Sequence, residues 1–175
     1  MLINAKKLIN LPIIEAVTMK KVAVVDNLIV SPENGAVLAF LLRKNFLSNK
    51  NRIVVLHDVR EMYIDGLVTN SKDNIINPDE VIKVKSVLDQ NIFLLGSRVI
   101  TQNSKILGYL EDFIFDTGFS AIVTLIVKKR FSTEKRIISA ERILNIQPGR
   151  IVIRDISNKV EVPKVSKVLE PVLPI

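Results

Sequence analysis

The chain of 175 residues is 48% hydrophobic but only 5% aromatic, and it contains no cysteine, so disulfides, thiolate catalysis and Cys-ligated zinc are excluded. It has no apolar run near the roughly 20 residues of a membrane-spanning helix and no signal-peptide pattern, so we expect a cytoplasmic protein. The net charge of +7 is concentrated in residues 81–175, which hold 15 cationic and 9 anionic residues, against 10 and 9 in residues 1–80.

The first half of the chain predicts short strands separated by turn signals. The strands are expected at residues 22–30, 36–43, 52–56, 61–64 and 67–69. Pro32 fixes φ early in the first turn, while Asn34-Gly35 and Asp65-Gly66 supply the positive φ that tight hairpins need. The strand at 36–43 is almost continuously apolar, which predicts burial on both of its faces.

A short helix is predicted in the connector that follows. Asn77 is suited to an N-cap, Pro78 to the first helical position and Glu80 to the third. We expect about two helical turns beginning at Pro78.

The second half of the chain repeats the first at an offset of 85 residues, which becomes 84 after the loss of one residue. The aligned segments are 20–30 over 105–115, 36–43 over 121–128, and 52–54 over 136–138. Short strands at this spacing indicate a small antiparallel barrel or sandwich in each copy. Two copies packed together bury more apolar area than a marginal unit of about 60 residues buries alone.

The aligned segments carry motifs that resemble a known family. In the second copy these are Leu94-Leu95-Gly96, Ile106-Leu107-Gly108, Glu111-Asp112 and Phe113-Ile114-Phe115-Asp116; in the first they are Val22-Ala23, Asp26-Asn27 and Ser31-Pro32-Glu33-Asn34-Gly35. Each copy resembles a PRC-barrel domain, the small β-barrel shared by the photosynthetic reaction-centre H subunit and the ribosome-maturation factor RimM. The first copy departs from the pattern, with Leu11 in place of Gly96 and Ala23 in place of Gly108. The resemblance implies a binding or scaffolding module.

We therefore predict an all-β protein of two tandem small antiparallel PRC-type β-barrels, joined by a short helix-containing linker. The predicted boundaries are 1–72 for the first barrel, 73–90 for the linker, 91–156 for the second barrel and 157–175 for an extended tail. The oligomeric state stays open.

No motif points to catalysis, a cofactor or a metal ion. His57 is the only histidine, and no nucleophile elbow accompanies it. Asp112 and Asp116 share a strand face but stand about 13 Å apart. No glycine-rich loop precedes a helix. We expect a non-enzymatic protein without cofactor or metal.

One group of cations is a candidate patch for an anionic partner. It contains Lys128, Lys129, Arg130, Lys135 and Arg136, on the two arms of a hairpin predicted from 122–127 and 136–139. A protein partner is the primary hypothesis, giving an adaptor that acts at a membrane surface or in a larger assembly. RNA or the ribosome is the alternative, giving a maturation factor similar to RimM, although stacking aromatics are scarce. An anionic membrane surface and simple solvated charge are further alternatives.

Overall fold

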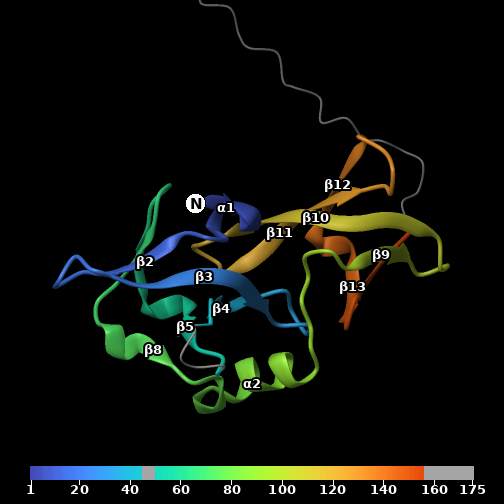
Figure 1. Ribbon diagram of the computed structural model, residues 1–175. Helices are drawn as coiled ribbons and strands as arrows, with labels where there is room; N and C mark the ends of the chain where they lie inside the picture. The colour runs from blue at the N-terminus through green and yellow to red at the C-terminus, as the bar shows by residue number, and fades with distance from the viewer. Residues whose placement is uncertain (45–49, 156–175) are drawn as a thin grey trace, which may run out of the picture.

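The computed structural model describes residues 1–44 and 50–155, and its architecture is mostly β (Figure 1). Two curled sheets lie side by side, and the helix α2 (Ile82–Asp89) packs below the first of them. The predicted tail at 157–175 lies outside the described residues. Buried Ile, Val, Leu and Phe side chains of both sheets form one hydrophobic core, with Phe40, Phe113 and Phe115 among the largest.

The first sheet has the strand order β6-β7-β2-β3-β4-β5-β8. Its elements are β2 (Pro12–Glu15), β3 (Lys21–Val30), β4 (Val37–Leu42), β5 (Ile53–Val55), the 3-10 helix η1 (Leu56–Asp58), β6 (Val59–Met62), β7 (Leu67–Thr69) and β8 (Ile75–Ile76). These bounds agree with the predicted strands to within a few residues, except for β2 and β8, which were not predicted.

The second sheet has the strand order β12-β11-β10-β9-β14-β13. Its elements are β9 (Arg98–Thr101), β10 (Ile106–Asp116), β11 (Ala121–Lys128), β12 (Lys135–Ser139), the 3-10 helix η4 (Ala140–Arg142), β13 (Ile143–Gln147) and β14 (Arg150–Ile153). Taken in reverse, from β13 to β12, this order matches the order of the first sheet from β6 to β5, strand for strand.

The prediction of purely antiparallel barrels is wrong in one respect. β2 pairs with β7 in parallel, and β9 pairs with β14 in parallel. The 3-10 helices η1 and η4 explain this, because each bends the chain at a corner without reversing its direction. The intervening strands then supply the long crossover that a parallel pair needs.

The pairing register also recurs between the sheets. A β-bulge precedes Asn27 in β3 and Asp112 in β10. In both strands the side-chain Oδ1 accepts a hydrogen bond of 2.8 Å from the next backbone N–H, that of Leu28 or Phe113. Asn27 and Asp112 are 85 positions apart, the offset of the sequence repeat.

The two sheets meet at their turn ends. Ala36 forms a β-bridge with Ala121, which lies 85 positions later. The N–H of Val37 donates to the Ser120 carbonyl at 2.7 Å, and the N–H of Ile122 donates to the Gly35 carbonyl at 3.1 Å. Because equivalent residues exchange these bonds, the contact has approximate two-fold symmetry.

The N-terminal segment belongs to the second sheet rather than the first. β1 (Leu2–Asn4) pairs with the end of β10, and the short helix α1 (Ala5–Leu8) follows. The Asp112 carboxylate holds this segment, because it accepts bonds of 3.0 Å from Asn4 Nδ2 and from the Lys6 N–H. The predicted first unit at 1–72 therefore begins with a segment that pairs elsewhere.

The predicted helix start forms a 3-10 turn. Asn77 and Glu80 make a reciprocal capping box around η3 (Pro78–Glu80), with the Asn77 N–H donating to Glu80 Oε1 at 2.9 Å. Val81 is extended, with φ −126° and ψ 100°, so it separates this turn from α2. The α-helix thus begins at Ile82, four residues later than predicted.

Candidate partner-binding surface

The hairpin of β11 and β12 holds the predicted cations. Lys128 and Lys135 face each other as the last pair of the ladder. Lys129 and Arg130 lie in the turn beyond it, and both are exposed. Arg136 lies next to Lys135, so its side chain points to the opposite face of the sheet. The hairpin thus brings Lys128 and Lys135 to one face but places Arg136 on the other.

The tip of this hairpin carries an exposed aromatic ring. Phe131 is 95% exposed and has a φ of 60°, which is uncommon for a non-glycine residue. The Arg130 guanidinium lies 5.0 Å from the ring centroid, within cation–π range. The Arg130 charge and the Phe131 ring therefore form one unit at the tip.

Gly108 sets the close approach of β10 to the turn end of β11. Its φ is +150°, and a Cβ added there would lie 2.3 Å from the Lys128 carbonyl oxygen. Since that contact is with backbone, no side chain can move to relieve it. Only glycine lets the end of β11 lie this close to β10.

The register of the second sheet aligns two exposed arginines and a half-buried tyrosine with Lys128 and Lys135. Paired positions on successive strands form one line, which we call the basic row: Arg150, Arg98, Tyr109, Lys128 and Lys135. Directly paired residues point to the same face of a sheet. The next residues along β14 and β9, Ile151 and Val99, are fully buried, which places the row on the outer face.

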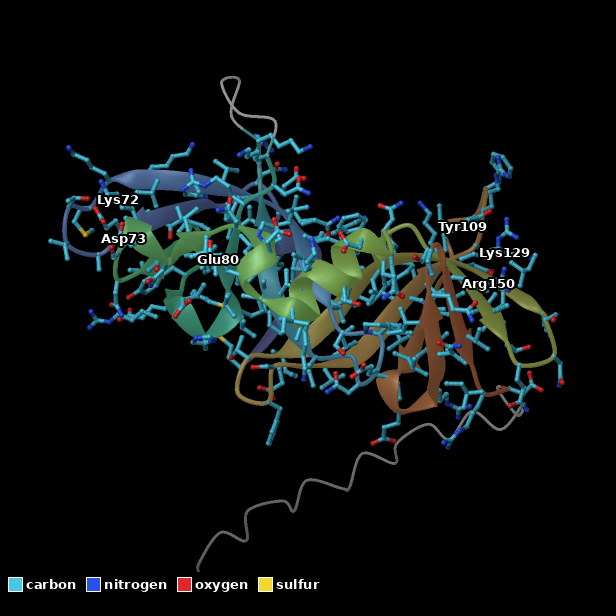
Figure 2. All side chains as sticks on the ribbon, turned by 90° about the horizontal axis from the view of Figure 1, so that it is seen from below. Lys72, Asp73, Glu80, Tyr109, Lys129 and Arg150 are labelled. Carbon is cyan, nitrogen blue, oxygen red and sulfur yellow. The ribbon has the colours of Figure 1, made fainter. Side chains whose placement is uncertain are left out.

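Two members of the basic row, Tyr109 and Arg150, lie at one end of the molecule (Figure 2). The neighbouring Lys129 lies there too, whereas Lys72 and Asp73 lie at the opposite end. A shallow hollow of about 270 Å³ opens beside the row, and its lining includes Gly96 and Gly149. A Cβ added to either glycine meets no atom within 4 Å, so the backbone there is open to a ligand.

One carboxylate neutralises the end of the row. Glu111 Oε2 lies 2.9 Å from Lys135 Nζ. This close ion pair lowers the pKa of Glu111 below its ordinary value of 4.5, partial desolvation opposes the shift, and Lys6 and Lys128 lower the pKa further from a distance. Glu111 therefore stays ionised near neutral pH and occupies Lys135.

The sequence prediction missed Arg98, Arg150 and Tyr109. Arg98 and Tyr109 lie on the consecutive strands β9 and β10, but Arg150 lies far along the chain on β14, and the parallel pairing of β9 with β14 was not predicted. The signal that could have found them is the repeat, because it aligns Arg150 with Gly66 at the offset of 84. A charge appears there in the second copy at a position that is neutral in the first.

The outer edge of β12 pairs with no described strand. In the first sheet the equivalent strand, β5, is covered by β8. On β12 the outward-facing Ile137 is 80% exposed, next to Lys135. The open edge thus adjoins the basic row.

The remaining residues singled out in the sequence have structural surroundings. His57 is 79% exposed in its side chain, and its Nε2 lies 3.3 Å from Asp58 Oδ1. Asp112 holds the N-terminal segment, and Asp116 Oδ1 accepts a 2.7 Å bond from the Gly118 N–H. Within residues 1–44 and 50–155, no group of three or more His, Asp or Glu side chains could hold a metal ion. Among the same residues, none of the helices is long and apolar enough to span a bilayer.

The comparisons with known proteins bear on the second sheet. Residues 94–160 match the PRC-barrel domain, a range that contains β9 to β14. Domains of this family are in general non-enzymatic and commonly serve as protein-interaction modules. No curated protein sequence matches the chain.

Proposed function

We propose that the chain is a non-enzymatic cytoplasmic adaptor, built from two PRC-barrel units, that binds a partner protein through the outer face of its second unit. The observation that carries the proposal is the basic row. Exposed cations on four of the five adjacent strands from β14 to β12, and on the adjoining turn, form a positive surface, and such surfaces recruit partners of opposite charge.

The assignment of two units is supported by pairing rather than by sequence identity. Strand order, parallel pair, corner helix and bulge recur in both sheets. The reciprocal bonds between the turns that end in Ala36 and Ala121 are those expected of two similar bodies that meet at equivalent turns. The proposed units run from β2 to β7 and from β9 to β14.

A ribosome-associated role remains the second candidate function. Lys129 and Arg130 add two exposed cations beside the row, and a contact with RNA phosphates would use the same charges. The shortage of free aromatic rings for base stacking counts against this role, because Tyr109 is half-buried and the ring of Phe131 lies against Arg130.

Capture from native lysate separates the two functions. The full-length chain is immobilised, and the lysate is divided into a nuclease-treated and an untreated portion. An adaptor retains the same protein partner from both portions, and the partner elutes with salt. If ribosomal proteins are retained from the untreated portion but not from the nuclease-treated portion, the ribosome-associated function is favoured over the adaptor function.

A further inference from the structure

We propose that the basic row binds one acidic α-helix of the partner protein, lying across the strands of the second unit. This inference rests on the proposed function and specifies the form of the ligand. It is drawn from the available charges, their spacing and the shape of the surface beside them.

Three cations of the row are available for a ligand. Arg150, Arg98 and Lys128 are exposed, and none forms an ion pair within the described part of the chain. Lys135 is already paired with Glu111. The ligand therefore meets a line of three cations, with the partly exposed Tyr109 between the second and the third.

The spacing of this line fits a helix. Neighbouring strands lie about 4.8 Å apart, so the three steps from Arg150 to Lys128 cover about 14 Å. An α-helix presents one residue per turn on a given face at intervals of about 5.4 Å, or about 16 Å over three steps. An extended strand presents same-face residues about 6.7 Å apart, or about 20 Å. The helix repeat exceeds the length of the row by about 2 Å and the strand repeat exceeds it by about 6 Å. The long side chains of Arg and Lys can bridge the smaller mismatch more readily than the larger one.

The surface beside the row accepts such an element. Arg98 and Arg150 offer two planar guanidinium groups, which bind carboxylates in a bidentate manner. Gly96 and Gly149 line the adjoining hollow without side chains, so a helix approaching the two arginines meets no bulky obstacle there. Acidic side chains at intervals of one turn are the chemistry that this surface recognises.

The test measures binding of the full-length chain to two fluorescent peptides of equal composition and about 20 residues. In the striped peptide, Glu residues follow the i, i+4, i+7, i+11 pattern of one helix face. In the control peptide, the same Glu residues are spread around the helix. We expect the striped peptide to bind about tenfold more tightly. Equal affinity for the two peptides would overturn the helical ligand.

Variants locate the binding site. Arg98→Glu combined with Arg150→Glu should weaken binding of the striped peptide by at least about tenfold. The matched control is Lys21→Glu combined with Lys83→Glu, which changes the net charge equally at exposed positions on β3 and α2 and should leave binding close to wild type. Arg98→Lys combined with Arg150→Lys keeps the charge and should retain part of the affinity, provided circular dichroism shows each variant folded. If the two double glutamate variants lost equal affinity for the striped peptide, the basic row would not be its binding site.

A gain of binding provides a readout that misfolding cannot imitate. Glu111→Gln releases Lys135 to the ligand, so the affinity for the striped peptide should rise about twofold to threefold. An unchanged or lower affinity would contradict the assignment of Lys135 to the same line.

Two competitors test the class of ligand. A ten-nucleotide uridine RNA and vesicles of phosphatidylcholine with phosphatidylglycerol should displace the striped peptide poorly. Displacement by either at lower concentration than the unlabelled peptide would assign the row to RNA or to a membrane surface instead. If lysate capture of a protein survives in the Arg98→Glu, Arg150→Glu variant, the helix proposal and the basic row as the binding surface both fail, and only an adaptor function through another surface stands.

Discussion

The two sheets share one pairing scheme and carry different outer surfaces. The line that holds Arg150, Arg98 and Tyr109 in the second sheet holds Gly66, Pro12 and Val24 in the first. Pro12 pairs with Val24 as Arg98 pairs with Tyr109, so the positions are equivalent. Only Lys128 has a cationic counterpart, Arg43, whose N–H donates to the Val24 carbonyl at 2.9 Å.

The grooves beside these lines differ in the same way. Beside the first sheet a groove of about 520 Å³ lies between the N-terminal segment and the β6–β7 hairpin, and it is lined largely by apolar side chains, among them Leu2, Leu11 and Ile64. In the second sheet the hollow beside Arg98 and Arg150 is lined largely by polar groups. The comparison teaches that inward positions keep their apolar character because the core depends on them, whereas outward positions are free to specialise for binding.

The largest difference between the sheets is expected at Gly108 and its equivalent, Ala23. Gly108→Ala should destabilise the protein by about 4 kcal/mol, because it combines a backbone clash with an unfavourable φ. Ala23→Gly, the reverse change, should cost about 1 kcal/mol or less. Urea unfolding of both variants measures the difference, and similar losses in the two would show that the close approach to Lys128 is not needed.

A smaller difference is expected at the residues after the bulges. Asp112 accepts three hydrogen bonds, from Asn4, Lys6 and Phe113, so Asp112→Ala should cost about 3 kcal/mol. Asn27→Ala loses only the bond from Leu28 and should cost about 1 kcal/mol.

The measurement combines thermal unfolding with hydrogen exchange. For Asp112→Ala, exchange should speed up in β1 before it does in the first sheet. Uniform acceleration through both sheets would contradict a local role in holding the N-terminal segment.

The residues inside the two bulges, Glu111 and Asp26, should differ in how they make the stability of the fold depend on pH. Glu111 has a lowered pKa, so its carboxylate stabilises the folded state above pH 4.5, and this contribution is lost as the pH falls through the lowered value. Glu111→Gln should therefore lower Tm at pH 7 and have little effect in strong acid. Asp26, at the equivalent bulge, is exposed and forms no ion pair within residues 1–44 and 50–155, so Asp26→Asn should lower Tm less at pH 7. A Glu111 effect of equal size at both pH values would rule out the ion pair with Lys135 as its cause.

The smallest effect is expected at His57. Its side chain is largely exposed near a corner, and its Nε2 lies 3.3 Å from Asp58 Oδ1. His57→Ala should change stability by about 0.5 kcal/mol and leave partner capture intact. Loss of function in a normally folded variant would reopen the possibility of an enzyme.

The sequence alone predicted the β character, most strand positions and the hairpin with Lys128 and Lys135, because alternation and turn residues are local signals. It placed the connector helix early, since the Asn77 cap serves a 3-10 turn and the extended Val81 follows it. Propensity at a cap fixes where a helical turn begins, but tertiary packing decides how far it continues.

The basic row and the pairing of β1 with β10 were decided by tertiary structure. Arg98 and Arg150 are separated by most of the second unit in the chain, and they meet because β9 and β14 pair in parallel. That pairing depends on the corner at η4, whose sequence does not mark it as a bend without reversal. Strand partners are chosen by long-range burial of both faces, so a surface assembled from several strands exists only once the sheet has formed.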